Sequence, residues 1–339
     1  MKAAYVKAPF QFIVKDVNLR PLSPTEVLVD VKACGVCGHD LIIANEKKEF
    51  TPFGHEVAGV VLETGSLVKN VKPGDKVAFE SGTFDRFSDN SRNGRVDLDN
   101  KGPNFWEREG GETMGFAEKI IVPCECCVKF DGISFENACI TEPLGVAMDI
   151  YKVSDIQFGQ DVLVIGLGPI GLMAARLAIK AGARNVYGCV HSTSENRVKL
   201  AKKWGLCDVI CSDVQDLEKY PFPKGGVDRV LVTAPPALIP VATKLCNVGG
   251  IVSFIGIDYG EGAMFTLDSN LVHFNKLQIR ASHAAPALYF PLCLDLIKTG
   301  VIPVEDLITH RFPLEDIQNA ITSFCADRTN RIKAVMVRE

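Results

Sequence analysis

The spacing of apolar residues changes character along the chain. Up to about residue 80, short alternating runs such as 26–32 and 56–63 predict half-buried strands, and glycine and proline separate them. From residue 161, continuous apolar runs alternate with helical patterns, which is typical of a parallel sheet covered by helices. We expect strands at 162–165, 185–190, 208–211, 227–232, 251–256 and 276–280, and helices at 172–181, 195–204 and 236–247.

The composition limits the class of protein. With 339 residues and 47% hydrophobic content, the chain can bury a large core, and its length suggests two domains. A net charge of −4 gives no reason to expect binding to nucleic acid or membranes, and no apolar run approaches the roughly 20 residues that cross a bilayer. The 12 cysteines do not suggest a disulfide framework, and the amino terminus does not resemble a signal peptide, so we expect a cytoplasmic protein.

A glycine-rich turn follows the first of the later strands. Gly166, Leu167, Gly168, Pro169, Ile170 and Gly171 separate strand 162–165 from the next expected helix. Glycines at this spacing permit a tight turn and let a pyrophosphate reach the helix amino terminus, where free N–H groups favour negative charge. A plain tight turn is the alternative, but the position between a strand and a helix favours a dinucleotide site.

The next strand, 185–190, ends without the acid that usually binds the adenosine ribose in NAD sites. His191 and Ser192 begin the polar segment 191–194, and Arg197 follows closely. Side chains of these kinds can hydrogen-bond a 2′-phosphate, which an acid would repel. The sequence therefore favours NADP(H) over NAD(H).

Three residues nearer the amino terminus are suited to zinc. Cys37, His55 and Glu56 offer a thiolate, an imidazole and a carboxylate, and a catalytic zinc usually takes three protein ligands and keeps one position open. An isolated His–Glu pair would be an ordinary surface or core pair, but Cys37 upstream favours a metal site. Cys34 lies three residues before Cys37, and with no second such pair nearby we expect it to be an ordinary strand residue.

The segment 54–77 contains Gly59, Gly65 and the run Lys-Pro-Gly-Asp at 72–75. With Cys37 upstream, it resembles the zinc-binding signature of the medium-chain dehydrogenase/reductase family, in the branch of zinc-dependent alcohol and polyol (sorbitol-like) dehydrogenases. The resemblance spans nearly the whole chain and implies an α/β fold. A β-rich, GroES-like catalytic domain would comprise 1–148 and 284–339, and a Rossmann NAD(P)-binding domain with a doubly wound parallel sheet would comprise 149–283.

The resemblance places Cys37, His55 and Glu56 at a catalytic zinc. Glu142, followed by proline, resembles the glutamate that sorbitol-type dehydrogenases supply near the zinc, although it is also suited to the first turn of a helix. Zinc at such a site lowers the pKa of the substrate hydroxyl, and the hydride passes to the nicotinamide.

Two residues beside Cys37 are expected to assist catalysis. Asp40 would accept a hydrogen bond from a histidine ligand and fix its tautomer. His39 stands where relatives have Ser or Thr as the first member of a proton relay, and their downstream relay histidine is missing here. An unperturbed pKa of about 6.5 suits histidine to such a relay. The alternative is that His39 only packs beside the zinc.

Further resemblances concern the cofactor and assembly. Turns near Thr233, Gly256, Ile257 and Ser282 correspond to those that pass the nicotinamide in relatives. Arg197 also resembles an arginine that NAD-using members keep, so the missing acid carries the NADP(H) prediction. Relatives form dimers or tetramers, so we expect a homo-dimer or homo-tetramer.

The polar segment 80–112 departs from the family. Many zinc-containing members carry four cysteines here that bind a structural zinc, but this chain has no cysteine between Cys37 and Cys124. We therefore predict one catalytic zinc and no structural zinc. Phe105 and Trp106 allow the segment to be a wall of the substrate site rather than a plain loop. Closely spaced cysteines at 124, 126 and 127 are expected to be small buried residues of a strand.

Together with these patterns, the resemblance implies an oxidoreductase that transfers hydride between a secondary alcohol of a polyol, sugar or cyclitol and NAD(P). The interval between Cys37 and His55 is shorter than in typical polyol or threonine dehydrogenases, in which this loop borders the substrate site. The resemblance therefore favours a bulky cyclic polyol, sugar or glycoside. A threonine-type or other alcohol dehydrogenase is the nearest alternative. A zinc-free, NADPH-binding reductase or sensor protein is the alternative of another class.

Overall fold

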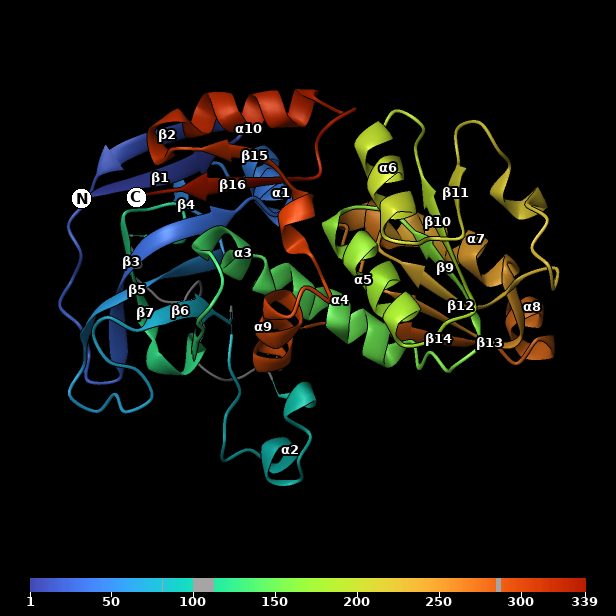
Figure 1. Ribbon diagram of the computed structural model, residues 1–339, viewed down its shortest axis with the longest axis horizontal. Helices are drawn as coiled ribbons and strands as arrows, with labels where there is room; N and C mark the ends of the chain where they lie inside the picture. Colours follow the sequence, from blue (N-terminus) through green and yellow to red (C-terminus); the bar gives the residue numbers. More distant parts are fainter. Residues whose placement is uncertain (81, 100–112, 285–287) are drawn as a thin grey trace. The chain divides into compact units, whose positions relative to one another are not determined.

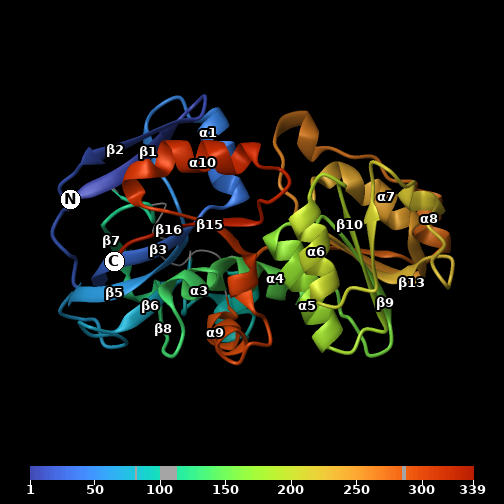
Figure 2. The same cartoon turned by 45° about the horizontal axis from the view of Figure 1, so that its top comes forward.

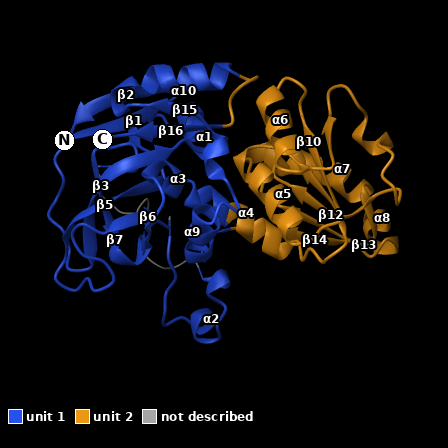
Figure 3. Cartoon of the chain, viewed as in Figure 1, with its two compact units in different colours: residues 1–145, 284–327, 333–339 blue, residues 146–283, 328–332 orange. Residues whose placement is uncertain are grey.

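The computed structural model describes residues 1–80, 82–99, 113–284 and 288–339 (Figure 1). Within these residues the chain divides into two compact units (Figure 3). Unit 1 comprises 1–145, 284–327 and 333–339, and unit 2 comprises 146–283 and 328–332. Phe105 and Trp106, to which the sequence assigns a possible place in the substrate site, lie outside the described residues.

The main sheet of unit 1 has the strand order β15-β16-β3-β5-β6-β8, and β7 also pairs with β3. All pairs are antiparallel except β15 with β16. On β3, Val27, Val29 and Val31 alternate into the core while the residues between them are less buried. The strands are β3 (Glu26–Gly35), β5 (Glu56–Thr64), β6 (Lys76–Phe79), β7 (Lys119–Pro123), β8 (Cys127–Lys129), β15 (Ile308–Phe312) and β16 (Lys333–Val337).

A smaller sheet of unit 1 joins β2 (Gln11–Asp16), β1 (Lys2–Lys7) and β4 (Thr51–Pro52). Figure 2 shows α10 lying along this side of the unit, where it contacts β2, β15 and β16. The helices of unit 1 are α1 (Gly38–Glu46), α2 (Asp89–Arg92), α3 (Phe135–Cys139), α9 (Phe290–Lys298) and α10 (Ile317–Ala326), and α4 (Thr141–Val153) runs from unit 1 into unit 2.

Unit 2 is built on a parallel sheet with the strand order β11-β10-β9-β12-β13-β14. Every residue of β9 is buried, as expected for a parallel strand covered on both faces. The order reverses between β9 and β12, which is the arrangement of a doubly wound dinucleotide-binding fold. Its strands are β9 (Asp161–Ile165), β10 (Asn185–Val190), β11 (Asp208–Cys211), β12 (Val227–Val232), β13 (Cys246–Phe254) and β14 (Gln278–Ala281), and its helices α5 (Pro169–Lys180), α6 (Glu195–Lys203), α7 (Ile239–Lys244) and α8 (Ser269–Phe274).

The strands that the sequence predicts for unit 2 are present, with β13 starting earlier than predicted. One local prediction was wrong, and one helix was missed. Residues 124–126 form a short 3-10 turn between β7 and β8 rather than part of a continuous strand. Helix α1 was not predicted at all, although it lies directly after Cys37.

Candidate metal centre and dinucleotide site

The structure brings Cys37, His55 and Glu56 together in unit 1. One ligand atom from each lies within 4.8 Å of the others, close to the span that two zinc–ligand bonds of about 2.0–2.3 Å can bridge. The antiparallel pairing of β3 with β5 brings Cys37 close to His55 and Glu56, because Gly35 at the end of β3 is opposite Glu56 at the start of β5. A Cβ atom on Gly35 would lie 2.0 Å from Glu56 Oε2, so glycine leaves room for the carboxylate.

A buried lysine contacts this cluster. Lys333, at the start of β16, donates from Nζ to the Glu56 carboxylate and to the carbonyl oxygen of Val36, at 2.9 Å. Burial lowers the pKa of Lys333, but the charges of Glu56 and Cys37 and the hydrogen bond to Glu56 outweigh it and raise the pKa above its ordinary value. Lys333 therefore carries a positive charge and holds the Glu56 carboxylate in place.

The histidine of the cluster lies in an acidic environment. Burial lowers the pKa of His55, but the charge and hydrogen bond of Cys37, followed by the charges of Asp40 and Glu142, outweigh it and raise the pKa well above its ordinary value. The acidic side chains thus stabilise a positive charge at this position. A divalent cation would be stabilised in the same way, and the thiolate, imidazole and carboxylate are all good zinc ligands.

Two buried carboxylate oxygens indicate whether the cluster is suited to a metal ion. Within the described residues, Glu56 Oε2 and Asp40 Oδ1 accept no hydrogen bond, although each lies in ion-pair contact with a cationic or histidine side chain. Buried polar atoms are normally satisfied, so an oxygen left without a hydrogen bond is suited to a ligand. The donor set of the cluster therefore fits zinc, and Glu56 Oε2, which contacts Lys333 as an ion pair, is the carboxylate oxygen without a hydrogen bond.

Asp40 lies close to His55 and is fully buried. Its Oδ2 accepts a hydrogen bond from the Cys37 backbone N–H at 2.8 Å, and its Oδ1 is 3.7 Å from His55 Nδ1. The second distance is longer than a hydrogen bond. Burial raises the pKa of Asp40, and the charge of His55 opposes that shift. Asp40 is thus hydrogen-bonded to the chain at Cys37 and lies near the imidazole of His55.

His39 is exposed, and its ring centroid is 6.3 Å from that of His55. Burial of part of the ring and the charge of His55 lower the pKa of His39, while Asp40 opposes the shift. The imidazole is therefore neutral near pH 7 and able to accept a proton.

Glu142 is in the first turn of α4 and is half-buried. It is not among the mutually close ligand atoms found in the described part of the chain. Burial raises its pKa to about 7, with the charge of His55 lowering it and that of Glu56 raising it. Glu142 thus shares the electrostatic environment of the cluster without being one of its three members.

The other cysteines of interest lie apart from the cluster. Cys34 is fully buried on β3, which confirms the prediction of a strand residue. Cys126 and Cys127 are buried, and Cys124 is half-buried in the turn before β8. Among the described residues, the cluster at Cys37 is the one group of three or more His, Cys, Asp or Glu side chains close enough together to hold a metal ion.

The glycine-rich turn in unit 2 has the expected geometry. Gly166 has φ of +100°, a conformation that glycine adopts without strain, and Gly168 is the N-cap of α5. A Cβ atom on Gly171 would lie 1.9 Å from the carbonyl oxygen of Gly166, so the helix packs closely on the turn. Thr233 Oγ1 donates to that same carbonyl oxygen at 2.5 Å. Leu167 is buried, and Pro169 and Ile170 begin α5.

The remaining cofactor candidates follow the carboxyl ends of parallel strands and so lie on one edge of the sheet. His191 and Ser192 follow β10, Gly256 and the exposed Ile257 follow β13, and Ser282 follows β14. Ser282 Oγ donates to Asp149 Oδ2 at 2.6 Å. Arg197 lies in α6, where its Nε donates to the Arg331 carbonyl oxygen at 3.2 Å.

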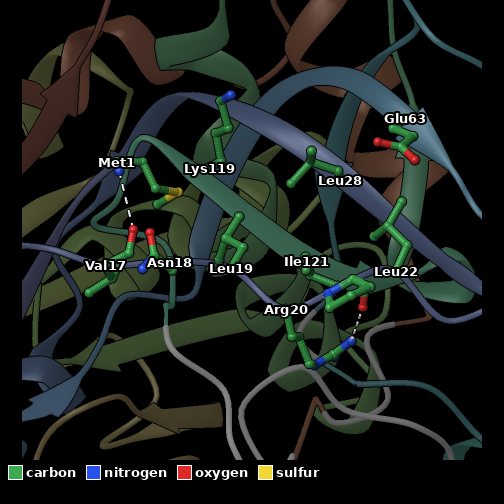
Figure 4. Close-up of a pocket in the computed structure, with 11 residues that line it drawn as sticks. Met1, Val17, Asn18, Leu19, Arg20, Leu22, Leu28, Glu63, Lys119 and Ile121 are labelled. Carbon is green, nitrogen blue, oxygen red and sulfur yellow. Dashed lines mark hydrogen bonds between the residues drawn. The ribbon is translucent and has the colours of Figure 1, made fainter.

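A shallow hollow of about 570 Å³ in unit 1 is a separate feature (Figure 4). Its lining includes Leu19, Arg20, Leu22, Glu63 and Lys119. No residue that the sequence assigns to the metal or the cofactor lines it, so it does not belong to the candidate site.

Sequence reasoning missed two charged residues of these sites, Lys333 beside Glu56 and Asp213 beside Ser192. Lys333 opens an apolar strand, which is an unusual position for lysine and was the available signal. Asp213 follows the strand next to β10, and only the order of strands in the sheet reveals that the two meet.

Two family models match the chain. The model described as alcohol dehydrogenase GroES-like domain matches residues 23–132, and the one described as zinc-binding dehydrogenase matches residues 169–299. A zinc-type donor set in unit 1 and a dinucleotide-binding fold in unit 2 define a zinc-dependent, NAD(P)-linked alcohol dehydrogenase. The chain belongs to the medium-chain dehydrogenase/reductase family, in its zinc-dependent alcohol and polyol dehydrogenase branch, and the predicted fold class is confirmed.

Individual relatives match over nearly their full length. The chain is 28% identical to the D-xylulose reductase of Saccharomyces cerevisiae, with 99% of this chain and 97% of the relative covered. It is 29% identical to an L-threonine 3-dehydrogenase of Escherichia coli, with 98% of each covered. Among solved structures, an alcohol dehydrogenase from Thermus sp. ATN1 superposes with a TM-score of 0.88 at 26% identity, with 99% of each chain covered. None of the helices in the described ranges combines the length and apolar character needed to span a membrane.

Proposed function

We propose that the enzyme transfers hydride between a secondary alcohol of a polyol, sugar or cyclitol and a nicotinamide dinucleotide, with a single zinc held by Cys37, His55 and Glu56. The mutual approach of these three ligand atoms within 4.8 Å carries the proposal. When bound, the metal polarises the substrate oxygen, and the nicotinamide exchanges the hydride.

The protein residues around the cluster have complementary roles in this proposal. Lys333 fixes the Glu56 carboxylate, and the nearby Asp40 carboxylate helps to set the orientation of His55. In its ionised form Glu142 adds negative charge near His55, which favours retention of the cation. In unit 2, the turn at 166–171 receives the pyrophosphate at the amino terminus of α5.

His39 is the proposed proton carrier for the substrate hydroxyl. Its exposure and its lowered pKa leave a neutral imidazole at pH 7. We expect His39→Asn to lower kcat by at least about 100-fold, the lower limit for loss of general acid–base catalysis, while zinc content stays unchanged. The exposed His273, on α8, offers a matched control as His273→Asn. Wild-type turnover in His39→Asn with zinc in place would show that His39 only packs at the site.

The substrate class rests on the family branch and on the similarity to the D-xylulose reductase. The comparable similarity to an L-threonine 3-dehydrogenase makes threonine the second candidate. A panel of polyols, cyclitols, sugars, threonine and ethanol, followed by NAD(P)H absorbance, tests the proposal. We expect turnover of polyols, cyclitols or sugars and little turnover of threonine or ethanol. Preference for threonine would establish the second candidate, and preference for ethanol would reject both.

Three further proposals concern the protein as a whole. The absence of cysteine between Cys37 and Cys124 supports one zinc per chain and no structural zinc. The position of β14 at one end of the described strand order supports a homo-dimer or homo-tetramer that pairs sheet edges. The spread of cysteines supports a cytoplasmic location.

The preference between NAD(H) and NADP(H) depends on the segment after β10. The sequence favours NADP(H) because this segment contains no acid. The folded chain adds a carboxylate at this position, from Asp213, which follows β11. We propose that the Asp213 carboxylate has a larger effect on cofactor preference than the lack of an acid in the segment after β10. NAD(H) is then the preferred cofactor.

A further inference from the structure

Asp213 lies next to the segment that follows β10. Strands β10 and β11 are parallel neighbours with Val190 opposite Cys211, so residues just beyond these two positions meet at the carboxyl edge of the sheet. The Ser192 backbone N–H donates to Asp213 Oδ1 at 2.7 Å, and the Ser192 hydroxyl donates to Oδ2. The two hydrogen bonds fix the carboxylate at the end of β10.

The side chains that suggested a 2′-phosphate site make some of their contacts within the protein. Ser192 gives both its donors to Asp213. His191 Nδ1 lies 3.0 Å from Thr193 Oγ1 and 3.5 Å from the Asp213 carboxylate. Arg197 donates from Nε to a backbone carbonyl oxygen, and burial lowers its pKa. The folded segment therefore offers fewer donors to a phosphate than its residue types indicate.

We propose that Asp213 is a specificity-determining residue that reads the adenosine ribose and discriminates against a 2′-phosphate. In dinucleotide-binding folds the acid that binds the ribose hydroxyls usually stands at the end of the second strand, which is β10 here. Asp213 provides an equivalent carboxylate from the neighbouring strand. Its oxygens can accept hydrogen bonds from ribose hydroxyls, and its charge repels the phosphate of NADP(H). The inference rests on the proposed dinucleotide site and reverses the NADP(H) preference favoured by the sequence.

The hydrogen bonds from Ser192 also keep Asp213 ionised. They lower the pKa of its carboxyl below the ordinary value. The hydrogen bond from the hydroxyl has the larger effect, and that from the backbone N–H the next largest. Asparagine has nearly the same shape as aspartate and can still accept a hydrogen bond from the Ser192 backbone. Asp213→Asn thus removes the charge and keeps the local geometry. Asp213 is exposed, so the change leaves the core intact.

The test measures dissociation constants for NADH and NADPH by cofactor fluorescence, using the full-length enzyme. We expect the wild type to bind NADH more tightly, and Asp213→Asn to shift the ratio of the two constants toward NADPH by about tenfold or more. The matched control is Asp216→Asn, because Asp216 carries the same charge three residues further along and pairs with Lys219 at the surface. The control is expected to leave the ratio unchanged.

Each outcome has a distinct meaning. A shifted ratio in Asp213→Asn alone supports the inference. An unchanged ratio in Asp213→Asn, with both cofactors still bound, overturns the role of Asp213 but leaves the dehydrogenase proposal in place. An equal shift in both variants attributes the effect to net charge and also overturns the inference. Failure of the wild type to bind either cofactor overturns the dinucleotide site itself, and with it this inference.

Discussion

Replacing Cys37 with serine is expected to remove zinc from the enzyme and to lower kcat/KM by more than about 100-fold. Residues that only orient metal ligands typically contribute about 10- to 100-fold to metal affinity or activity, so loss of a ligand exceeds that range. Cys37 is also the N-cap of α1, where its Sγ accepts a hydrogen bond from the His39 backbone N–H at 3.5 Å. Serine can replace the cap but not the thiolate, so the substitution tests the metal role separately from the helix.

Zinc content by mass spectrometry and kcat/KM on the best polyol substrate measure the two effects. Cys207→Ser is a matched control, because Cys207 is exposed in unit 2 and lies outside the cluster. The control should retain both zinc and activity. A Cys37→Ser enzyme that keeps its zinc would show that the thiol is not a ligand.

Replacing Lys333 with methionine is expected to destabilise unit 1 by about 3–5 kcal/mol when zinc has been removed by a chelator. Lys333 and Glu56 are both almost completely buried, with exposures of 3% and 1%. Removing one partner of a buried ion pair leaves the other charge without compensation, and this costs about 3–5 kcal/mol. Urea unfolding of the chelated protein measures the free energy of unfolding, and bound zinc is expected to reduce the difference because it compensates Glu56.

A surface lysine provides the comparison. Lys244 pairs with Glu218, and both side chains are about half exposed, at 53% and 42%. Lys244→Met is expected to cost about 0–1 kcal/mol. The double variant Lys333→Met with Glu56→Gln should recover part of the lost stability, because the buried Glu56 carboxylate that has lost its partner is then replaced by a neutral amide. If Lys333→Met and Lys244→Met lower the free energy of unfolding by the same small amount, the buried ion pair does not stabilise unit 1.

The sequence predicts the strands of the unit 2 sheet well, because each strand and turn is indicated by residues that are adjacent in the sequence. Apolar runs of buried strands and the glycine turn at 166–171 are visible without knowledge of the fold. Residues Cys37, His55 and Glu56 could be selected together because each is a good zinc ligand and the segment 54–77 resembles a zinc-binding signature. Their proximity, in contrast, follows from the antiparallel register of β3 and β5, which the structure supplies.

The missed features depend on the fold or on weak local signals. Helix α1 contains adjacent Ile42 and Ile43 and starts from a cysteine cap, which is not among the preferred N-cap residues. Lys333 reaches Glu56 because β16 pairs with β3, and Asp213 reaches Ser192 because β11 lies beside β10. Pairings between segments distant in sequence cannot be inferred from residue periodicity. Charged residues that act through such pairings are therefore the part of the site that sequence reasoning misses.

The central claim, one catalytic zinc held by Cys37, His55 and Glu56, is tested most directly by measuring zinc content and dehydrogenase activity on the same wild-type sample. The account predicts one zinc per chain, parallel loss of zinc and activity on chelation, and recovery of both when one equivalent of zinc is added. Full activity in protein that contains no divalent metal would contradict it.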